Sequence, residues 1–167
     1  SFNVIPELLQ EQVIKENPLI VWLDYDKELG GDEIDELRHT VEWMPDNSVL
    51  LVTFDASDKK YGKDPDEKRS ELKEIFGAIS PDDIPREDLR GLAFGELMAT
   101  LTSELLHSKA SDVARDGGGI PAFKIVYRDK ATMATVGIVL PSRQDKEAVN
   151  RTVAEGDWPG FVREPVE

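Results

Sequence analysis

The chain has 167 residues and a formal net charge of −14, with 34 acidic and 20 basic side chains. Such an excess of acids argues against a groove for nucleic-acid phosphates and against an anionic membrane surface, because both need clustered Lys and Arg. The absence of cysteine excludes disulfides, thiol nucleophiles and Cys-ligated metals. No apolar run approaches the roughly 20 residues of a membrane span, so we expect a cytoplasmic protein with one α/β domain over residues 1–167.

Two aliphatic strands joined by a helix are predicted in the first third of the chain. Residues 6–16 predict a leading helix, residues 19–26 a strand, and residues 49–55 a second strand. The helix between the strands is predicted over residues 32–44, with Asp32 as its N-cap. Both strands are almost continuously aliphatic, which is typical of strands buried on both faces of a parallel sheet. The segment therefore predicts a parallel β-α-β unit with a right-handed crossover.

A helical excursion is predicted over residues 57–118. Asp64-Pro65-Asp66-Glu67 combines a cap, a proline in the first turn and acids near the helix start, which predicts a helix over residues 64–76. An apolar stripe at helical spacing predicts a longer amphipathic helix over residues 94–108.

The chain then returns to strands. Residues 123–128 and 133–140 predict an antiparallel hairpin. A helix over residues 143–153 and a surface tail around residues 158–161 follow. The predicted fold class is α/β, with a three-layer mixed sheet that has a parallel β-α-β core, a helical excursion and a terminal antiparallel hairpin.

This order of elements resembles the carboxyl-terminal half of a class I S-adenosylmethionine-dependent methyltransferase, in which the last strand inserts antiparallel between its two predecessors. Trp22-Leu23-Asp24-Tyr25-Asp26 looks like the strand tip where these enzymes position the substrate, and residues 127–140 look like their closing hairpin. In that fold the methyl donor is bound by a glycine-rich turn after the first strand and by an acid that ends the second. No such glycine-rich strand-turn-helix precedes Asp24.

The resemblance implies that the chain is the substrate-side half of a longer methyltransferase-like protein. S-adenosylmethionine would serve the full-length parent, and this chain alone would bind no cofactor and be inactive. The expected partner is the missing amino-terminal half or another protein, with neither nucleic acid nor membrane.

Acids end both predicted parallel strands, and ligand sites in such sheets lie beyond the carboxyl ends of the strands. We take Asp24 and Asp26 as the candidate catalytic residues, which would position an acceptor or remove a proton from its hydroxyl or amine. Tyr25, Thr53 and Asp55 are the candidate substrate-binding residues. The acids from Asp24 onward outnumber the nearby Lys, which predicts a negative rim that favours cations over anions.

Three alternatives stay open for these residues. The aspartates at the strand ends could hold Mg²⁺ or Ca²⁺, which prefer carboxylate oxygens, or they could simply cap the loops that follow the strands. A non-catalytic interaction module with a degenerate Rossmann-like fold is the second alternative, in which residues 64–108 contact a partner. The third is a haloacid-dehalogenase-like phosphatase, whose nucleophile motif Asp24-Tyr25-Asp26 resembles, with Thr53 in a later strand; Lys27-Glu28 stands where that family has Gly-Thr.

Overall fold

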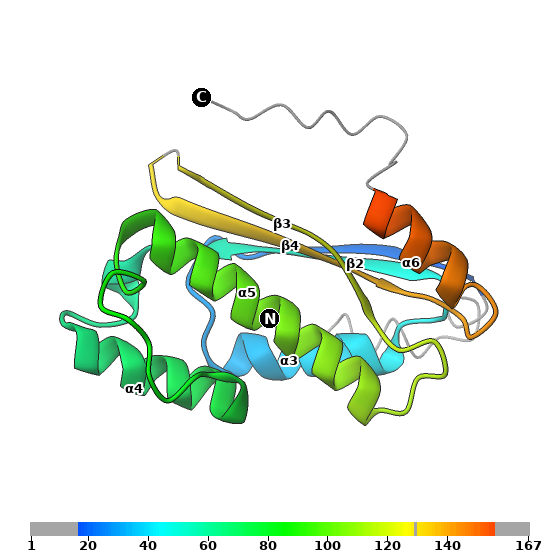
Figure 1. The fold of residues 1–167 in the computed structure, drawn as a ribbon, viewed down its shortest axis with the longest axis horizontal. Helices are drawn as coiled ribbons and strands as arrows, with labels where there is room; N and C mark the ends of the chain where they lie inside the picture. The colour runs from blue at the N-terminus through cyan, green and yellow to red at the C-terminus, as the bar shows by residue number, and fades with distance from the viewer. Residues whose placement is uncertain (1–16, 129, 156–167) are drawn as a thin grey trace.

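Four strands form one open mixed sheet in the computed structural model, which describes residues 17–128 and 130–155 (Figure 1). The sheet order is β1-β2-β4-β3, with β1 parallel to β2 and β4 antiparallel to both of its neighbours. The bounds are β1 Ile20–Asp24, β2 Ser48–Asp55, β3 Ile120–Arg128 and β4 Thr132–Leu140. The predicted helix over residues 6–16 and the tail at residues 158–161 lie outside the described residues.

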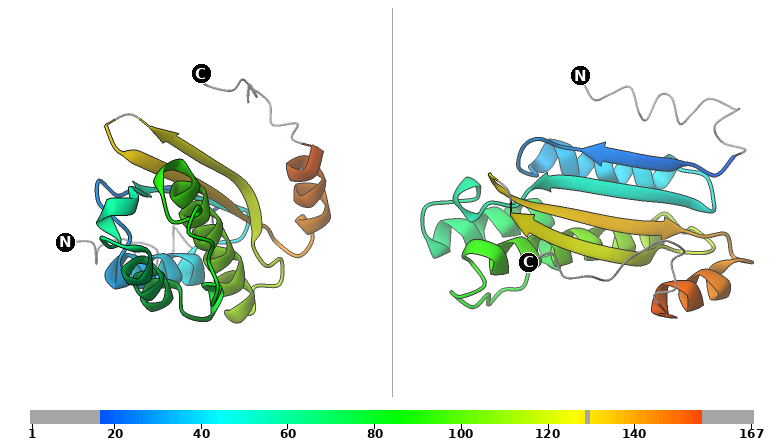
Figure 2. Two further views of the ribbon diagram at one scale, coloured as in Figure 1. Left: turned by 60° about the vertical axis from the view of Figure 1, so that its left-hand side comes forward. Right: turned by 90° about the horizontal axis from the view of Figure 1, so that it is seen from above.

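The position of β4 confirms the predicted fold class. β4, the last strand of the described residues, lies between β2 and β3 and not at an edge of the sheet, as the view from above shows (Figure 2). The predicted parallel β-α-β unit and the antiparallel hairpin are both present. β3 begins at Ile120, three residues earlier than predicted, and its pairing with β4 is irregular between Pro121 and Phe123.

Helices cover the two faces of the sheet unequally. The helices α3 (Gly31–Trp43), α4 (Pro65–Phe76) and α5 (Gly91–Asp112) lie on one face, and α6 (Lys146–Glu155) lies on the other (Figures 1 and 2). Two short 3₁₀ helices, η1 (Asp58–Lys60) and η2 (Gly77–Ile79), flank α4 in the sequence. The face opposite α3 and α5, which we call the open face, is covered among the described residues by α6 alone.

The observed N-termini of α4 and α3 can be compared with the N-caps predicted from the sequence. The side chain of Asp64 accepts hydrogen bonds from the backbone N–H groups of Asp66 and Glu67, which confirms the predicted start of α4. The prediction of an N-cap at Asp32 is wrong, because α3 begins at Gly31 and its cap is Gly30. The Glu33 carboxylate accepts from the Gly30 N–H at 3.0 Å, which is half of a capping box. α5 also extends beyond the predicted 94–108 at both ends.

The core lies between the sheet and the layer of α3 and α5. Leu50, Val52 and Phe54 alternate along β2 and are fully buried, because every second side chain of a strand points to the same face. Val136 and Ile138 of β4 are buried beside them. Burying one such aliphatic or aromatic side chain contributes about 1.5–3 kcal/mol, so this alternation fixes which face of the sheet the helices cover.

Gly95 allows α5 to approach the hairpin closely. A Cβ atom at this position would lie 2.8 Å from Cγ1 of Val126 and 2.9 Å from Cγ2 of Thr132, one residue from each strand of the hairpin. Such distances are too short for a side chain. The glycine therefore sets the separation between α5 and the sheet.

Arg115 joins the end of α3 to the segment after α5. Its Nη1 donates hydrogen bonds to the carbonyl oxygens of Val41 (3.1 Å) and Met44 (2.6 Å), and its Nη2 lies 2.8 Å from the Asp46 carboxylate. The side chain is only 8% exposed. The guanidinium thus satisfies carbonyl groups that the end of a helix leaves without a partner.

Replacing Arg115 with alanine should lower the free energy of unfolding by about 2–4 kcal/mol, because the carbonyl groups of the buried residues Val41 and Met44 would lose their hydrogen-bond donor. Urea denaturation followed by circular dichroism would measure the change. The matched control is Arg38→Ala, whose exposed ion pair with Asp35 within α3 should be worth no more than about 0.5 kcal/mol. Equal losses in the two variants would contradict the role assigned to Arg115.

Candidate functional site

The carboxyl ends of β1 and β2 lie side by side and form one rim. Asp24 pairs with Thr53 in the register of the two strands. Beyond the strand, the N–H of Tyr25 donates to the Thr53 carbonyl at 2.8 Å, and the N–H of Asp55 donates to the Lys27 carbonyl at 3.1 Å. The segment after β1 therefore stays beside β2 and holds all five predicted site residues near one end of the sheet.

Asp24 and Asp26 are the freest carboxylates on this rim. Both are exposed, and neither forms a hydrogen bond or an ion pair with any residue that the structure describes. Asp24 follows Trp22 by two positions, so its side chain projects to the open face, whereas Leu23 and Tyr25 project into the core. These two carboxylates are thus available to a ligand.

Asp55 and Thr53 are more strongly bound into the protein. Asp55 is 8% exposed, and its Oδ1 accepts from the Ser57 N–H at 2.8 Å, which caps the loop after β2. The Thr53 hydroxyl lies 3.0 Å from Nε1 of Trp22 and 3.0 Å from the Thr135 hydroxyl. Thr53 therefore links the side chains of three strands on the open face.

Tyr25 points to the opposite side of the sheet from Asp24. Its hydroxyl donates to Oε2 of Glu36 at 2.8 Å, between β1 and α3. Burial, together with the hydrogen bond to Glu36 and the charge of that group, raises the pKa of the Tyr25 phenol well above its ordinary range. Tyr25 is neutral at any physiological pH and helps to hold α3 against the strand. The sequence-predicted residues are thus close along the chain but divided between two faces.

The loop from β1 to α3 contains an ion pair that the sequence analysis did not single out. Lys27 Nζ pairs with the Glu33 carboxylate, which also accepts from the Gly30 N–H. Burial of Glu33 acts in the opposite direction, but the bonds from Lys27 and Gly30 outweigh it and lower the pKa of Glu33. The spacing of three residues between Gly30 and Glu33 is a sequence signal that could have revealed the hydrogen bond between these two residues.

Metal binding at the rim has no geometric support. Within residues 17–128 and 130–155, no group of three or more His, Asp or Glu side chains is arranged to hold a metal ion.

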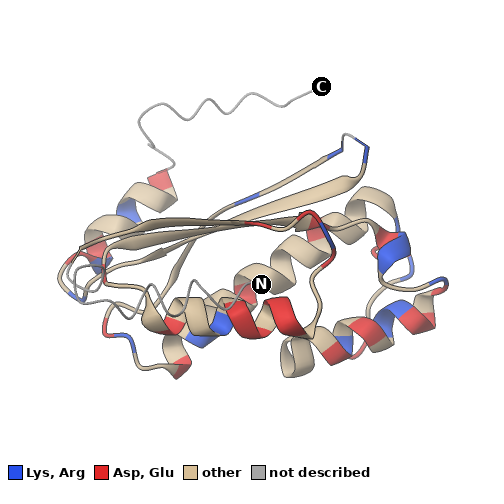
Figure 3. Cartoon of the chain, turned by 180° about the vertical axis from the view of Figure 1, so that it is seen from behind, with Lys and Arg blue, Asp and Glu red and all other residues tan. Residues whose placement is uncertain are grey.

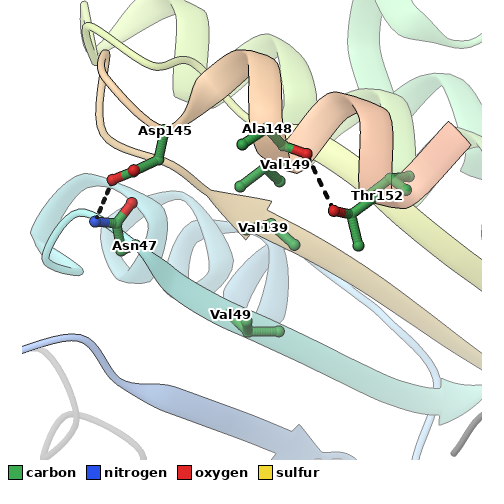
Figure 4. Close-up of a pocket in the computed structure, with 8 residues that line it drawn as sticks. Asn47, Val49, Val139, Asp145, Ala148, Val149 and Thr152 are labelled. Carbon is green, nitrogen blue, oxygen red and sulfur yellow. Dashed lines mark hydrogen bonds between the residues drawn. The ribbon is translucent and has the colours of Figure 1, made fainter. Parts of the chain in front are cut away.

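A separate pocket of about 490 Å³ lies beneath α6, at the other end of β2 (Figure 4). Val49 and Val139 of the sheet and Val149 of α6 line it. Asn47 Nδ2 donates to Asp145 Oδ2 at 2.9 Å at its edge. Because Val49 lies near the amino end of β2, this pocket is distant in the sheet from the Asp24 rim and is separate from the candidate site.

The fold and the rim define a class of protein. A parallel β1-α3-β2 unit, a last strand inserted antiparallel between its two predecessors, and acids at the tips of the parallel strands together form the carboxyl-terminal arrangement of a methyltransferase-like Rossmann domain.

Comparison with known families agrees with this class. Residues 1–163 match the model of a family described as "Putative O-methyltransferase", and the chain belongs to that family. The match gives no support to the phosphatase alternative. Searches of curated proteins and of solved structures gave no match. None of the helices in the described part of the chain combines the length and apolarity needed to cross a membrane.

The methyl donor that this family implies is S-adenosylmethionine. Among the described residues, the turn from β1 to α3 is a candidate for binding it. The turn from β1 to α3 places Gly30 and Gly31 at the start of a helix, as a nucleotide-binding turn would. However, the Gly30 N–H is already bonded to the Glu33 carboxylate, so this donor of the turn is not available to a ligand. This turn therefore does not fit the donor.

The Glu33 interactions predict a specific pH dependence of stability. Because the pKa of Glu33 is lower in the folded chain than in the unfolded chain, its ionised form favours folding. The contribution should be complete above the ordinary carboxyl pKa of about 4.3 and should be lost as the pH falls through the lower pKa of the folded state.

The variant Glu33→Gln should therefore be less stable than the wild type by about 0.5–1.5 kcal/mol at pH 7, because solvent screens the half-exposed Lys27, and the difference should shrink between pH 5 and pH 3 (about the range of carboxyl titration). Urea denaturation at several pH values would measure it. Glu42→Gln, an exposed position on the same helix with the same charge change, is the control and should follow the wild-type curve. A difference that is independent of pH would rule out the ion pair as its source.

Proposed function

We propose that this chain forms the acceptor side of an O-methyltransferase, with the substrate hydroxyl at the rim of β1 and β2. The observation that carries the proposal is the exposed carboxylate of Asp24, which stands at the end of a strand without a partner among the described residues. Asp26 lies two residues on, and the membership of the family supports methyl transfer to oxygen.

Asp24 would act on the acceptor and not on the donor. A hydroxyl oxygen becomes a better nucleophile as its proton is removed, and a positioned carboxylate can accept that proton. Asp26 would help to orient the acceptor through a second hydrogen bond. Thr53 and Asp55, which are already bonded to Trp22 and Ser57, would contribute by holding the shape of the rim, and Tyr25 by holding the strand against α3.

We further propose that the donor is bound by an amino-terminal half that pairs with β1. In the described sheet β1 is an edge strand, and edges of sheets are normally paired or blunted. Ile20 and Trp22 on this strand are 78% and 62% exposed. Ile125 and Tyr127 of β3 are also exposed, and the strand register places them on the same open face. Within residues 17–128 and 130–155 no strand pairs with the outer edge of β1, and this edge beside an apolar face supports a docking position for further sheet and helices.

If the donor site lies outside this chain, calorimetry should detect no binding of S-adenosylmethionine to it at donor concentrations up to about 1 mM, where a binding free energy of only about −4 kcal/mol would be visible. The native protein in its full length is the positive control. Micromolar affinity of this chain alone would contradict the proposal that the donor is bound outside it.

In the full-length native protein, Asp24→Asn should reduce kcat for methyl transfer by about 100- to 10,000-fold, the usual contribution of a general base. Incorporation of a labelled methyl group into a panel of small hydroxylated acceptors would measure this. Asp112→Asn, an exposed aspartate at the end of α5, is the matched control and should retain full activity.

Two outcomes would count against the proposal. Unchanged kcat in Asp24→Asn would remove the assigned base. A native protein that transfers no methyl group to any acceptor would favour the alternative of a non-catalytic interaction module.

A further inference from the structure

Several basic side chains lie near one another around the loop that precedes α4, although the molecule as a whole is acidic. Figure 3 shows Lys and Arg at the tip of the hairpin and, interspersed with Asp and Glu, along α4 nearby, while much of α3 carries acids. A pocket of about 500 Å³ lies in this basic region. Four basic and two acidic side chains line it, whereas the whole chain has 20 basic and 34 acidic ones. We call it the basic pocket; its charged lining residues are Asp58, Lys59, Lys63, Asp64, Lys68 and Arg90.

Both acids of the basic pocket are already used inside the protein. Asp58 Oδ2 lies 2.8 Å from Nζ of Lys68. Asp64 caps α4 by accepting from the N–H groups of Asp66 and Glu67 at 2.9 and 3.0 Å. The first backbone donors of α4 are therefore occupied, and a ligand would have to be recognised by side chains rather than by the helix end.

Lys68 forms a fixed part of the pocket wall. Its side chain is 7% exposed, and its ammonium group donates to Asp58 and to the Leu89 carbonyl at 2.9 Å. The same ammonium lies 5.7 Å from the centre of the Phe94 ring, a cation–π arrangement. A buried lysine held by three different elements cannot move away when a ligand enters.

The other three cations have no counter-ion among the described residues. Lys59, Lys63 and Arg90 form no ion pair there, although the neighbouring Lys60 reaches Glu28 at 3.5 Å. Arg128 adds a further positive charge, since its guanidinium lies 3.9 Å from the position of a Cβ on Gly91. Gathering like charges around a concave surface is unfavourable, and a bound anion would relieve the repulsion.

The loop between η1 and α4, which carries Lys63, has a defined backbone. Gly62 has a φ of 140°, which favours glycine, and a Cβ there would lie 2.9 Å from the backbone nitrogen of Lys68. The Lys63 N–H donates to the Glu67 carboxylate at 2.8 Å. Lys59 is thus presented from η1, and Lys63 from the loop that follows η1 and packs against the start of α4.

We propose that the basic pocket binds an oxyanion, namely the phosphate or carboxylate group of a small molecule. Lys59, Lys63 and Arg90 would pair with the anion, and Lys68 would set the positive potential of the wall. The lining of the pocket begins at Asp58, three residues after the end of β2 at Asp55, and so starts at the same end of the sheet as the Asp24 rim. Binding of an anion in this pocket does not depend on methyl transfer.

An NMR titration of the uniformly ¹⁵N-labelled chain with inorganic phosphate tests the proposal, with chloride adjusted to keep the ionic strength constant. We expect saturable shifts of the backbone amide signals of Gly62, Lys63 and Arg90. The double variant Lys59→Gln/Lys63→Gln should weaken the affinity at least tenfold. Lys146→Gln/Arg151→Gln on α6, which removes the same charge elsewhere, should bind phosphate as the wild type does.

A second titration with succinate separates the two kinds of oxyanion, and saturable binding of either compound supports the pocket. Shifts that are linear in concentration and spread over lysines throughout the chain would overturn the proposal. Equal weakening in both double variants would overturn it as well, because general charge and not the pocket would then govern binding.

Discussion

The pairing of β2 with β4 is the constraint on which the other features depend. The two strands remain in register from Ser48 opposite Leu140 to Asp55 opposite Met133, over the whole length of β2. This pairing brings the hairpin against a strand formed far earlier in the chain and buries Phe54 between the sheet and the helices. It also decides where β2 ends, and the candidate rim and the basic pocket both begin at that end. A shift of one residue would exchange the buried and open faces of β2.

Acidic and basic side chains occupy different parts of the rim. Acids follow β1, and the partly buried Lys27–Glu33 pair leaves Asp24 and Asp26 as the available charges on that side. Bases follow β2, where Lys68 is held in place and other cations surround it. The net charge of −14 averages over these two regions and so conceals the second one. An acceptor with a hydroxyl near one end and an anionic group near the other would match both.

Much of the fold could be predicted from the sequence, because its signals are local. Aliphatic runs mark β1 and β2, and the cap at Asp64 marks α4. The arrangement of the candidate site was less accessible. Asp24 and Tyr25 are adjacent in sequence yet project to opposite faces, and only the packing of α3 against Tyr25 shows which face is open. Nor can sequence distinguish a lysine that has a counter-ion from one that does not, because the partner comes from a distant element. The roles of Asp24, Asp26, Tyr25, Thr53 and Asp55 in catalysis or binding remain predictions.

The insertion of β4 between β2 and β3 has a consequence for biosynthesis. Thr53 and Thr135, which share a hydrogen bond in the finished sheet, are 82 positions apart. At a ribosomal rate of about 5–20 residues per second, β2 emerges roughly 4–16 s before the strand that will pair with it. During that interval one side of an aliphatic strand has no hydrogen-bonding neighbour from β4. The nascent chain is therefore most exposed to aggregation while the helices between the two strands are being translated.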